Sequence, residues 1–122
     1  IENRTLVEKM IDDLASEYKL NSEVYGNILV ATVEAVNNAI LHGNKMDETK
    51  KVYMNFEIVE HDLIIFIKDE GPGFDFNNIP DPTAPENIEK PHGRGIFLMK
   101  HLVDKIKFHN SGSKVELKFK LN

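Results

Sequence analysis

Apolar residues repeat with a helical period in the first part of the chain. Between residues 3 and 18 they recur every three or four positions, at Leu6, Val7, Met10, Ile11, Leu14 and Tyr18. This spacing predicts an amphipathic helix with one buried face. A second, mostly apolar segment starts after Asn21 or Ser22, either of which suits an N-cap, and runs to Gly43, a frequent helix terminator. The sequence therefore predicts two consecutive helices.

From Lys51 the apolar period shortens to two residues, which is typical of strands. Residues 51–58 alternate apolar and polar side chains, and a polar turn at 60–62 leads into residues 63–68, most of which are apolar on both faces. This pattern predicts an antiparallel hairpin whose second strand lies in the interior of a sheet and is covered by helices.

A loop rich in proline and glycine follows at residues 70–94, and loops of this length are usually functional. Helical spacing returns over residues 95–103, and alternation over 105–108 and 115–121 predicts a second hairpin. The order of helix, helix, strand, strand, loop, helix, strand, strand predicts an α+β fold, a two-layer sandwich with helices on one face of a mainly antiparallel sheet.

Composition narrows the class of protein. The chain has 122 residues, a net charge of −5 and 41% hydrophobic residues, so we expect residues 1–122 to form a single folded domain. It has no cysteine, which excludes a disulfide framework, a thiolate zinc site and a thiol nucleophile. No apolar run approaches the ~20 residues of a membrane span, and the lysines are scattered along the sequence. We therefore expect a cytoplasmic protein with no membrane partner and no direct nucleic-acid partner.

Two polar side chains interrupt the apolar second helix. Glu34 and Asn38 are four residues apart, so their side chains share one helix face about 5–6 Å apart. A carboxylate beside an amide oxygen suits a general base next to a Mg²⁺ ligand. An exposed glutamate beside a buried, hydrogen-bonded asparagine explains the same pair without a function, and the pair alone favours this simpler explanation.

Asp69 ends the apolar strand and is followed by a turn that contains Gly71 and Gly73. Taken alone, this segment is best explained as a turn capped by an aspartate. The alternative is a carboxylate that accepts a hydrogen bond from an exocyclic amino group, such as that of adenine. The two glycines would then let a flat ring approach the backbone.

Gly93, Arg94 and Gly95 precede a helix that is expected to begin near Ile96. Glycines are common at helix entrances for steric reasons, but a glycine-flanked helix N-terminus also presents free N–H groups to anions. Arg94 adds a permanent positive charge that suits a phosphate or a partner's carboxylate. The segment is explained about equally well as a helix entrance and as a phosphate-binding site.

The three motifs occur together far less often by chance than any one of them. Residues 33–43 (Val-Glu-Ala-Val-Asn-Asn-Ala-Ile-Leu-His-Gly), 69–73 and 92–99 resemble the N, G1 and G2 boxes of the GHKL superfamily. The sequence looks most like the bacterial anti-sigma factor serine/threonine kinases. This resemblance, over about residues 24–107, implies the Bergerat or histidine-kinase-like ATPase fold with a mainly antiparallel mixed sheet.

The resemblance also implies a role for each candidate residue. Glu34 would be the general base, Asn38 would bind the Mg²⁺ that bridges the ATP phosphates, and Asp69 would hold the adenine amino group. Gly71 and Gly73 would line the adenine pocket, Gly93, Arg94 and Gly95 would contact the phosphates, and residues 74–91 would form a lid over ATP.

The activity implied by the resemblance is that of an ATP-dependent serine/threonine protein kinase. It would act as an anti-sigma factor that phosphorylates an anti-anti-sigma protein of the STAS type and sequesters a sigma factor, and it would form a homodimer. One alternative is a nucleotide-gated protein-binding module without phosphotransfer, which Pro91 favours because proline lacks an N–H for phosphate. The other is a detached histidine-kinase catalytic domain, which Leu41 disfavours because histidine kinases commonly carry lysine or arginine there.

Overall fold

The computed structural model describes residues 2–45, 47–73 and 91–121. Its helical segments are α1 (Glu2–Tyr18), α2 (Ser22–Asn38), the π-helical turn η1 (Ala39–Gly43), α3 (Pro91–Leu102) and the 3-10 turn η3 (Asn110–Gly112). Its strands are β1 (Tyr53–Val59), β2 (Asp62–Lys68), β3 (Lys105–His109) and β4 (Lys114–Lys120). The predicted order of helices and hairpins is confirmed.

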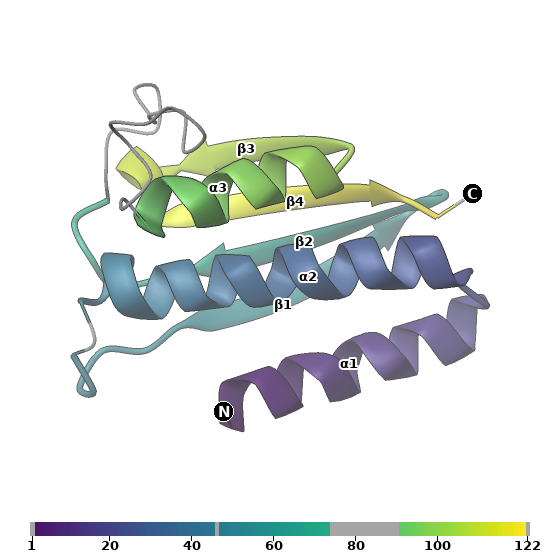
Figure 1. The fold of residues 1–122 in the computed structure, drawn as a ribbon, viewed down its shortest axis with the longest axis horizontal. Coiled ribbons are helices and arrows are strands. Elements are labelled where there is room, and N and C mark those ends of the chain that lie inside the picture. The colour runs from purple at the N-terminus through teal and green to yellow at the C-terminus, as the bar shows by residue number, and fades with distance from the viewer. Residues whose placement is uncertain (1, 46, 74–90, 122) are drawn as a thin grey trace.

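The four strands form one sheet in the order β1-β2-β4-β3. β2 lies in its interior, between β1 and β4, as the apolar sequence of this strand predicts. Helices α1, α2 and α3 lie together on one face of the sheet (Figure 1). The α+β two-layer fold is confirmed. All pairings among the described strands are antiparallel, so this part of the chain contains no parallel pair of a mixed sheet.

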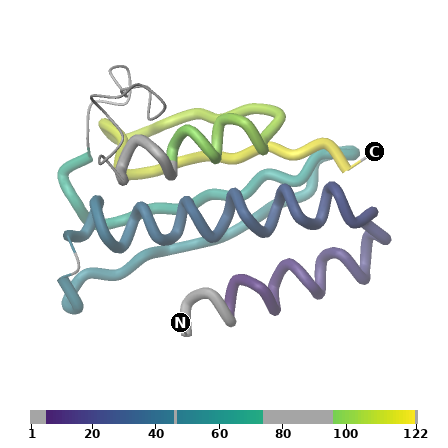
Figure 2. Tube along the Cα trace, viewed as in Figure 1, coloured from purple at the N-terminus to yellow at the C-terminus, as the bar shows by residue number. Residues whose placement is uncertain are grey.

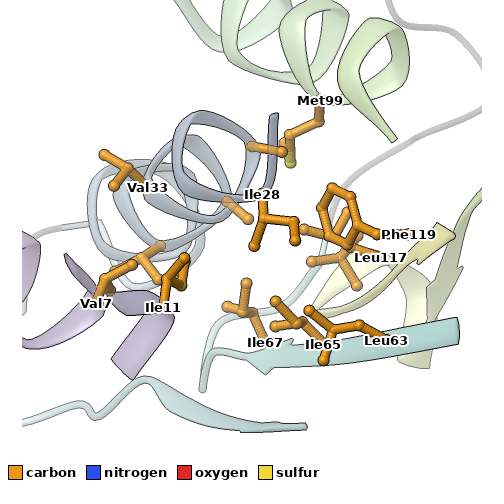
Figure 3. Packing of buried hydrophobic residues seen from close by; sticks show 14 of the residues in the cluster. Val7, Ile11, Ile28, Val33, Leu63, Ile65, Ile67, Met99, Leu117 and Phe119 are labelled. Carbon is orange, nitrogen blue, oxygen red and sulfur yellow. The ribbon is translucent and has the colours of Figure 1, made fainter. Parts of the chain in front are cut away.

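Helix α2 lies at the centre of the helical layer and supplies much of the core. Asn21 is its N-cap, as predicted, because the side-chain oxygen accepts a hydrogen bond from the Val24 N–H at 2.8 Å. Ile28 is fully buried and points from α2 toward Ile65 of β2 and Leu117 of β4, which are also fully buried (Figure 3). Alternation along β2 and β4 places every second side chain in this core.

Helix α1 packs along one side of α2 (Figure 2). Val7, Ile11 and Leu14 are buried, as the helical spacing predicts. Leu6 and Tyr18 were expected on the same buried face, but 66% of Leu6 and 42% of Tyr18 is exposed. Because α1 contacts the layer along a narrow stripe, residues beside that stripe stay in contact with water.

The segment Ser22–Gly43, which joins α2 and η1, is long and apolar enough to cross a membrane by length and composition. The expectation that no segment approaches that length is therefore wrong. The core helix of a globular protein passes the same test, and here Ile28, Ala31 and Ala35 are buried within the protein. Packing in the core accounts for the apolar composition of this helix.

The sheet face opposite the helices is rich in lysine. Side chains that alternate with the buried positions of the strands point to this face, and they include Lys68, Lys105, Lys107, Lys114, Lys118 and Lys120. The Lys118 Nζ pairs with an Asp62 carboxylate oxygen at 3.3 Å, and the Lys114 Nζ lies 4.9 Å from the centre of the Phe66 ring. Lysines that are scattered along the sequence thus gather on one surface, which the linear pattern did not indicate.

Candidate functional site

Three segments that are far apart in the sequence meet at one end of the sandwich. The end of α2, the end of β2 and the start of α3 all lie there (Figure 1). The lining of a small cavity at this end includes Asn38 of α2, Asp69 after β2, Met99 of α3 and Ser113 before β4. The structure therefore brings Asn38 and Asp69 to one site, and it adds side chains from α3 and from the β3–β4 turn.

Asp69 is buried, with 7% of its surface exposed. Its Oδ1 accepts a hydrogen bond from the Gly71 N–H at 2.8 Å, and its own N–H donates to the Ser113 carbonyl oxygen at 2.8 Å. Burial raises the pKa of Asp69, while the Gly71 N–H and the positive charge of Lys50 oppose this shift. Oδ2 accepts no hydrogen bond from the described part of the chain. Asp69 thus caps a turn with one oxygen, as the simpler interpretation expects, while its other oxygen has no donor among the described residues.

Helix α2 continues into a π-helical turn, which brings Gly43 against Asp69. The Asn44 N–H donates to the Ala39 carbonyl oxygen at 2.8 Å, five residues back. Such turns insert one extra residue into a helix and often occur at functional sites. A Cβ atom on Gly43 would lie 2.2 Å from the Asp69 Oδ2. The sequence predicted Gly43 only as a helix terminator, and its part in shaping the site was missed because nothing local distinguishes a π turn from an α-helical end.

Gly71 and Gly73 are required as glycines, but for a different reason from the predicted one. A Cβ on Gly71 would lie 1.8 Å from the Gly43 carbonyl oxygen. Gly73 has a φ of +86°, and a Cβ there would lie 2.0 Å from the Ser111 carbonyl oxygen. The space of each missing side chain is therefore occupied by the protein's own backbone rather than left for a flat ring.

Glu34 and Asn38 lie one turn apart on α2, and both are half-buried. Neither side chain forms a hydrogen bond or an ion pair with the described residues. The simpler explanation required an exposed glutamate and a hydrogen-bonded asparagine, and neither condition is met. Both side chains are partly exposed, so their polar atoms remain accessible to water or to a ligand.

The pair also fits a magnesium ion. Mg²⁺ usually keeps several waters and takes one or two protein oxygens besides phosphate oxygens. The unpartnered amide oxygen of Asn38 fits that requirement, and it lines the same cavity as Asp69. Among the described residues no group of three or more His, Cys, Asp or Glu side chains could hold a metal ion, so a metal site made of protein ligands alone is not present in that part of the chain.

Helix α3 begins earlier than predicted. It starts at Pro91 rather than near Ile96, so Gly93, Arg94 and Gly95 lie inside its first turns instead of before it. Proline is favoured in the first turn, where its missing N–H leaves no helical bond unmade. The N–H groups of Gly93 and Arg94 remain within the set of four that have no acceptor in the helix. The predicted lid lies outside the described residues except for Pro91.

Sequence comparison assigns this arrangement to a family. A family model described as "Histidine kinase-like ATPase domain" matches residues 2–119. The chain belongs to this family. The match extends from the start of α1 to within one residue of the end of β4, and it confirms the superfamily resemblance inferred from the three motifs.

Curated proteins are similar to this chain over most of its length. The chain is 30% identical to the serine-protein kinase RsbW of Oceanobacillus iheyensis, over 82% of this chain and 67% of that protein. It is 29% identical to an anti-sigma F factor of Clostridium perfringens, over 99% of this chain and 90% of that protein. The RsbW protein of Bacillus licheniformis is 27% identical over 96% of this chain and 78% of its own length. These relatives agree with the resemblance to anti-sigma factor kinases.

Proposed function

We propose that this protein is an ATP-dependent serine/threonine protein kinase that acts as an anti-sigma factor. The relatives named serine-protein kinase and anti-sigma F factor support both parts of this proposal. One observation links the proposed activity to particular residues. The half-buried Glu34 and Asn38 have no partner in the described part of the chain, and Asn38 shares a cavity with Asp69. A nucleotide bound at Asp69 would place its phosphates toward that pair.

Each described residue would have one task in the transfer. The Oδ2 of Asp69, which has no donor among the described residues, would accept a hydrogen bond from the adenine amino group. Asn38 would hold a Mg²⁺ ion, which supplies positive charge to the phosphates. Glu34 would accept the proton of a substrate hydroxyl, whose oxygen forms a bond to the γ-phosphorus. The bond from that phosphorus to the bridging oxygen breaks, and ADP leaves.

The first turn of α3 would bind the phosphates. Gly93 and Arg94 present backbone N–H groups at the positive end of the helix dipole. Arg94 adds a full positive charge, and Gly95 continues the glycine-flanked turn. Pro91 supplies no N–H, so this turn has one donor fewer than a turn that begins with another residue.

The partners follow from the same proposal. The phosphorylated protein would be an anti-anti-sigma protein of the STAS type, and a sigma factor would be the sequestered partner. We also propose that the chain is a single domain that works as a homodimer in the cytoplasm, without a membrane or a direct nucleic-acid partner. The expectation that no nucleic acid binds is best tested on the lysine-rich face of the sheet, which carries Lys68, Lys105, Lys107, Lys114, Lys118 and Lys120.

Transfer of labelled γ-phosphate from Mg-ATP to purified STAS-type proteins tests the proposal. The wild type should label a serine or threonine in an acid-stable bond. Glu34→Gln should abolish labelling while ATP binding persists, and Asn38→Ala should weaken both. A matched control is Asn55→Ala, because Asn55 is exposed on β1, away from these residues.

The same assay separates the two alternatives. An acid-labile product would indicate a histidine kinase. ATP binding without any transfer would indicate a nucleotide-gated binding module.

A further inference from the structure

Three residues behind Asp69 form a closed ring of hydrogen bonds. The Glu70 N–H donates to the Asn44 Oδ1 at 2.7 Å. The Asn44 Nδ2 donates to the Lys51 carbonyl oxygen at 3.0 Å, and the Lys51 N–H donates to the Glu70 Oε1 at 2.6 Å. The ring ties together the end of η1, the chain entering β1 and the turn after β2.

Asn44 is the buried member of this ring. Only 3% of its surface is exposed. Both ends of its amide are used, the oxygen by Glu70 and the nitrogen by Lys51. An aspartate could accept from the Glu70 N–H but could not donate to the Lys51 carbonyl, and an alanine could do neither. The position therefore requires a side chain with a donor and an acceptor at this reach.

Two members of the ring are chain neighbours of residues at the Asp69 carboxylate. Asn44 follows Gly43, whose Cα packs on that carboxylate, and Glu70 follows Asp69 itself. The bond between Asn44 and the Glu70 N–H joins these two backbone segments. Gly71 closes the other side, because its missing Cβ makes room for the Gly43 carbonyl oxygen.

We infer that Asn44 is a positioning residue that holds the Asp69 carboxylate in the orientation that recognises the amino group of adenine. This inference rests on the proposed function, since it presumes that Asp69 binds adenine. None of the three hydrogen bonds involves Glu34 or Asn38. The ring therefore governs which nucleotide binds and how tightly, whereas the transfer step at saturating ATP depends on other residues.

Two triphosphates that differ only in the adenine amino group provide the test. ATP has this group, and purine riboside triphosphate lacks it. The wild type should bind ATP more tightly than the analogue. Asn44→Ala should weaken ATP binding by about tenfold, which corresponds to ~1.4 kcal/mol, and should leave binding of the analogue nearly unchanged, so that the ratio of the two dissociation constants falls toward one.

A second variant opens the same ring from an exposed residue. Glu70→Ala removes the acceptor of the Lys51 N–H, and because Glu70 lies on the surface we expect this variant to fold even if Asn44→Ala does not. It should lower the selectivity ratio in the same direction, whereas Glu70→Gln, which retains an acceptor oxygen, should restore it. Asn55→Ala is the matched control, because Asn55 is exposed on β1 and lies outside the ring.

Isothermal titration with each purified variant gives the dissociation constants, and its fitted stoichiometry gives the folded fraction. A fall in the ratio for both Asn44→Ala and Glu70→Ala supports the inference. An unchanged ratio, or equal weakening of both nucleotides, overturns it, since a purely structural role lowers the amount of folded protein without changing selectivity. Failure of the wild type to bind ATP would instead refute the proposed function, and the inference with it.

Discussion

The contact between Gly43 and Asp69 makes a sharp prediction about Gly43→Ala. The new Cβ would lie 2.2 Å from Oδ2 and 2.3 Å from Cγ of Asp69, whereas real Cβ contacts essentially never fall under 3.0 Å. The carboxylate or the π turn must therefore move by about 0.8 Å. Hydrogen bonds to Ser113 and Asn44 hold the backbone of Asp69 and Glu70 in place, so a backbone shift there cannot easily relieve the close contact.

The predicted loss has two parts. Overpacking at a buried position costs about 1–3 kcal/mol of folding free energy. A displacement of about 1 Å in a positioned group costs up to about 100-fold in function, so we expect ATP affinity to fall by about 10- to 100-fold. Urea unfolding measures the first part, and titration with ATP under conditions where the variant is folded measures the second.

Gly26→Ala is the control, because it makes the same chemical change in α2, the helix that continues into η1. A Cβ on Gly26 meets nothing within 4 Å. Alanine in a helix interior is about 0.5–1 kcal/mol more favourable than glycine, so this variant should be more stable and should bind ATP normally. ATP affinity within twofold of wild type in Gly43→Ala would refute the argument from the close contact.

Three further predictions test the remaining residues. Glu34→Gln should lower the transfer rate by at least ~100-fold, the usual contribution of a general base, and should change the dissociation constant for ATP by less than threefold. A quenched-flow assay measures the transfer rate, and titration measures the dissociation constant. A variant that retains the wild-type transfer rate would exclude Glu34 as the base. Thr32→Val should raise the free energy of unfolding by about 1 kcal/mol, because the buried Thr32 hydroxyl has no hydrogen-bond partner among the described residues. Urea unfolding measures this change, and a less stable variant would contradict the prediction. ATP binding should weaken as the pH falls and Asp69 takes up a proton, at a higher pH than for an ordinary aspartate because burial raises the pKa of Asp69. The same shift makes the stability contribution of Asp69 largest below its unfolded pKa and lost as the pH rises through its folded pKa, so Asp69→Asn should flatten that part of the stability profile, and an unchanged profile would contradict the shift.

Much of the fold was predictable from local patterns. The helical period gave α1 and α2 with the cap at Asn21, and the change to a period of two gave both hairpins. These features depend on residues within one element, which is why the sequence displays them. The predicted burial of Leu6 was wrong, because its exposure depends on how much of α1 the neighbouring helix covers, and that is a tertiary property.

The site was predictable as a set of motifs but not as a geometry. Asn38 and Asp69, which belong to two of the three motifs, line one cavity in the structure. The π turn, the contact of Gly43 with Asp69 and the ring around Asn44 left no pattern in the sequence, since each arises where two distant segments meet. The start of α3 was predicted near Ile96 because the two glycines were assigned to the helix entrance, whereas the helix begins at Pro91, a residue that is favoured at the first helical position.

The features that make the site suitable for a ligand also weaken the unliganded protein. Asp69 is buried with one oxygen that has no donor among the described residues, and Glu34 and Asn38 are half-buried without partners there. Burial disfavours the charged form of the Asp69 carboxylate, which would be better solvated in the unfolded chain, so this group subtracts from stability until a ligand satisfies it. Departures from local rules are expected at functional sites for this reason. A nucleotide that donates an amino group to Asp69 and brings a metal ion to Asn38 would satisfy both of these side chains, so ATP binding should raise the free energy of unfolding of this protein.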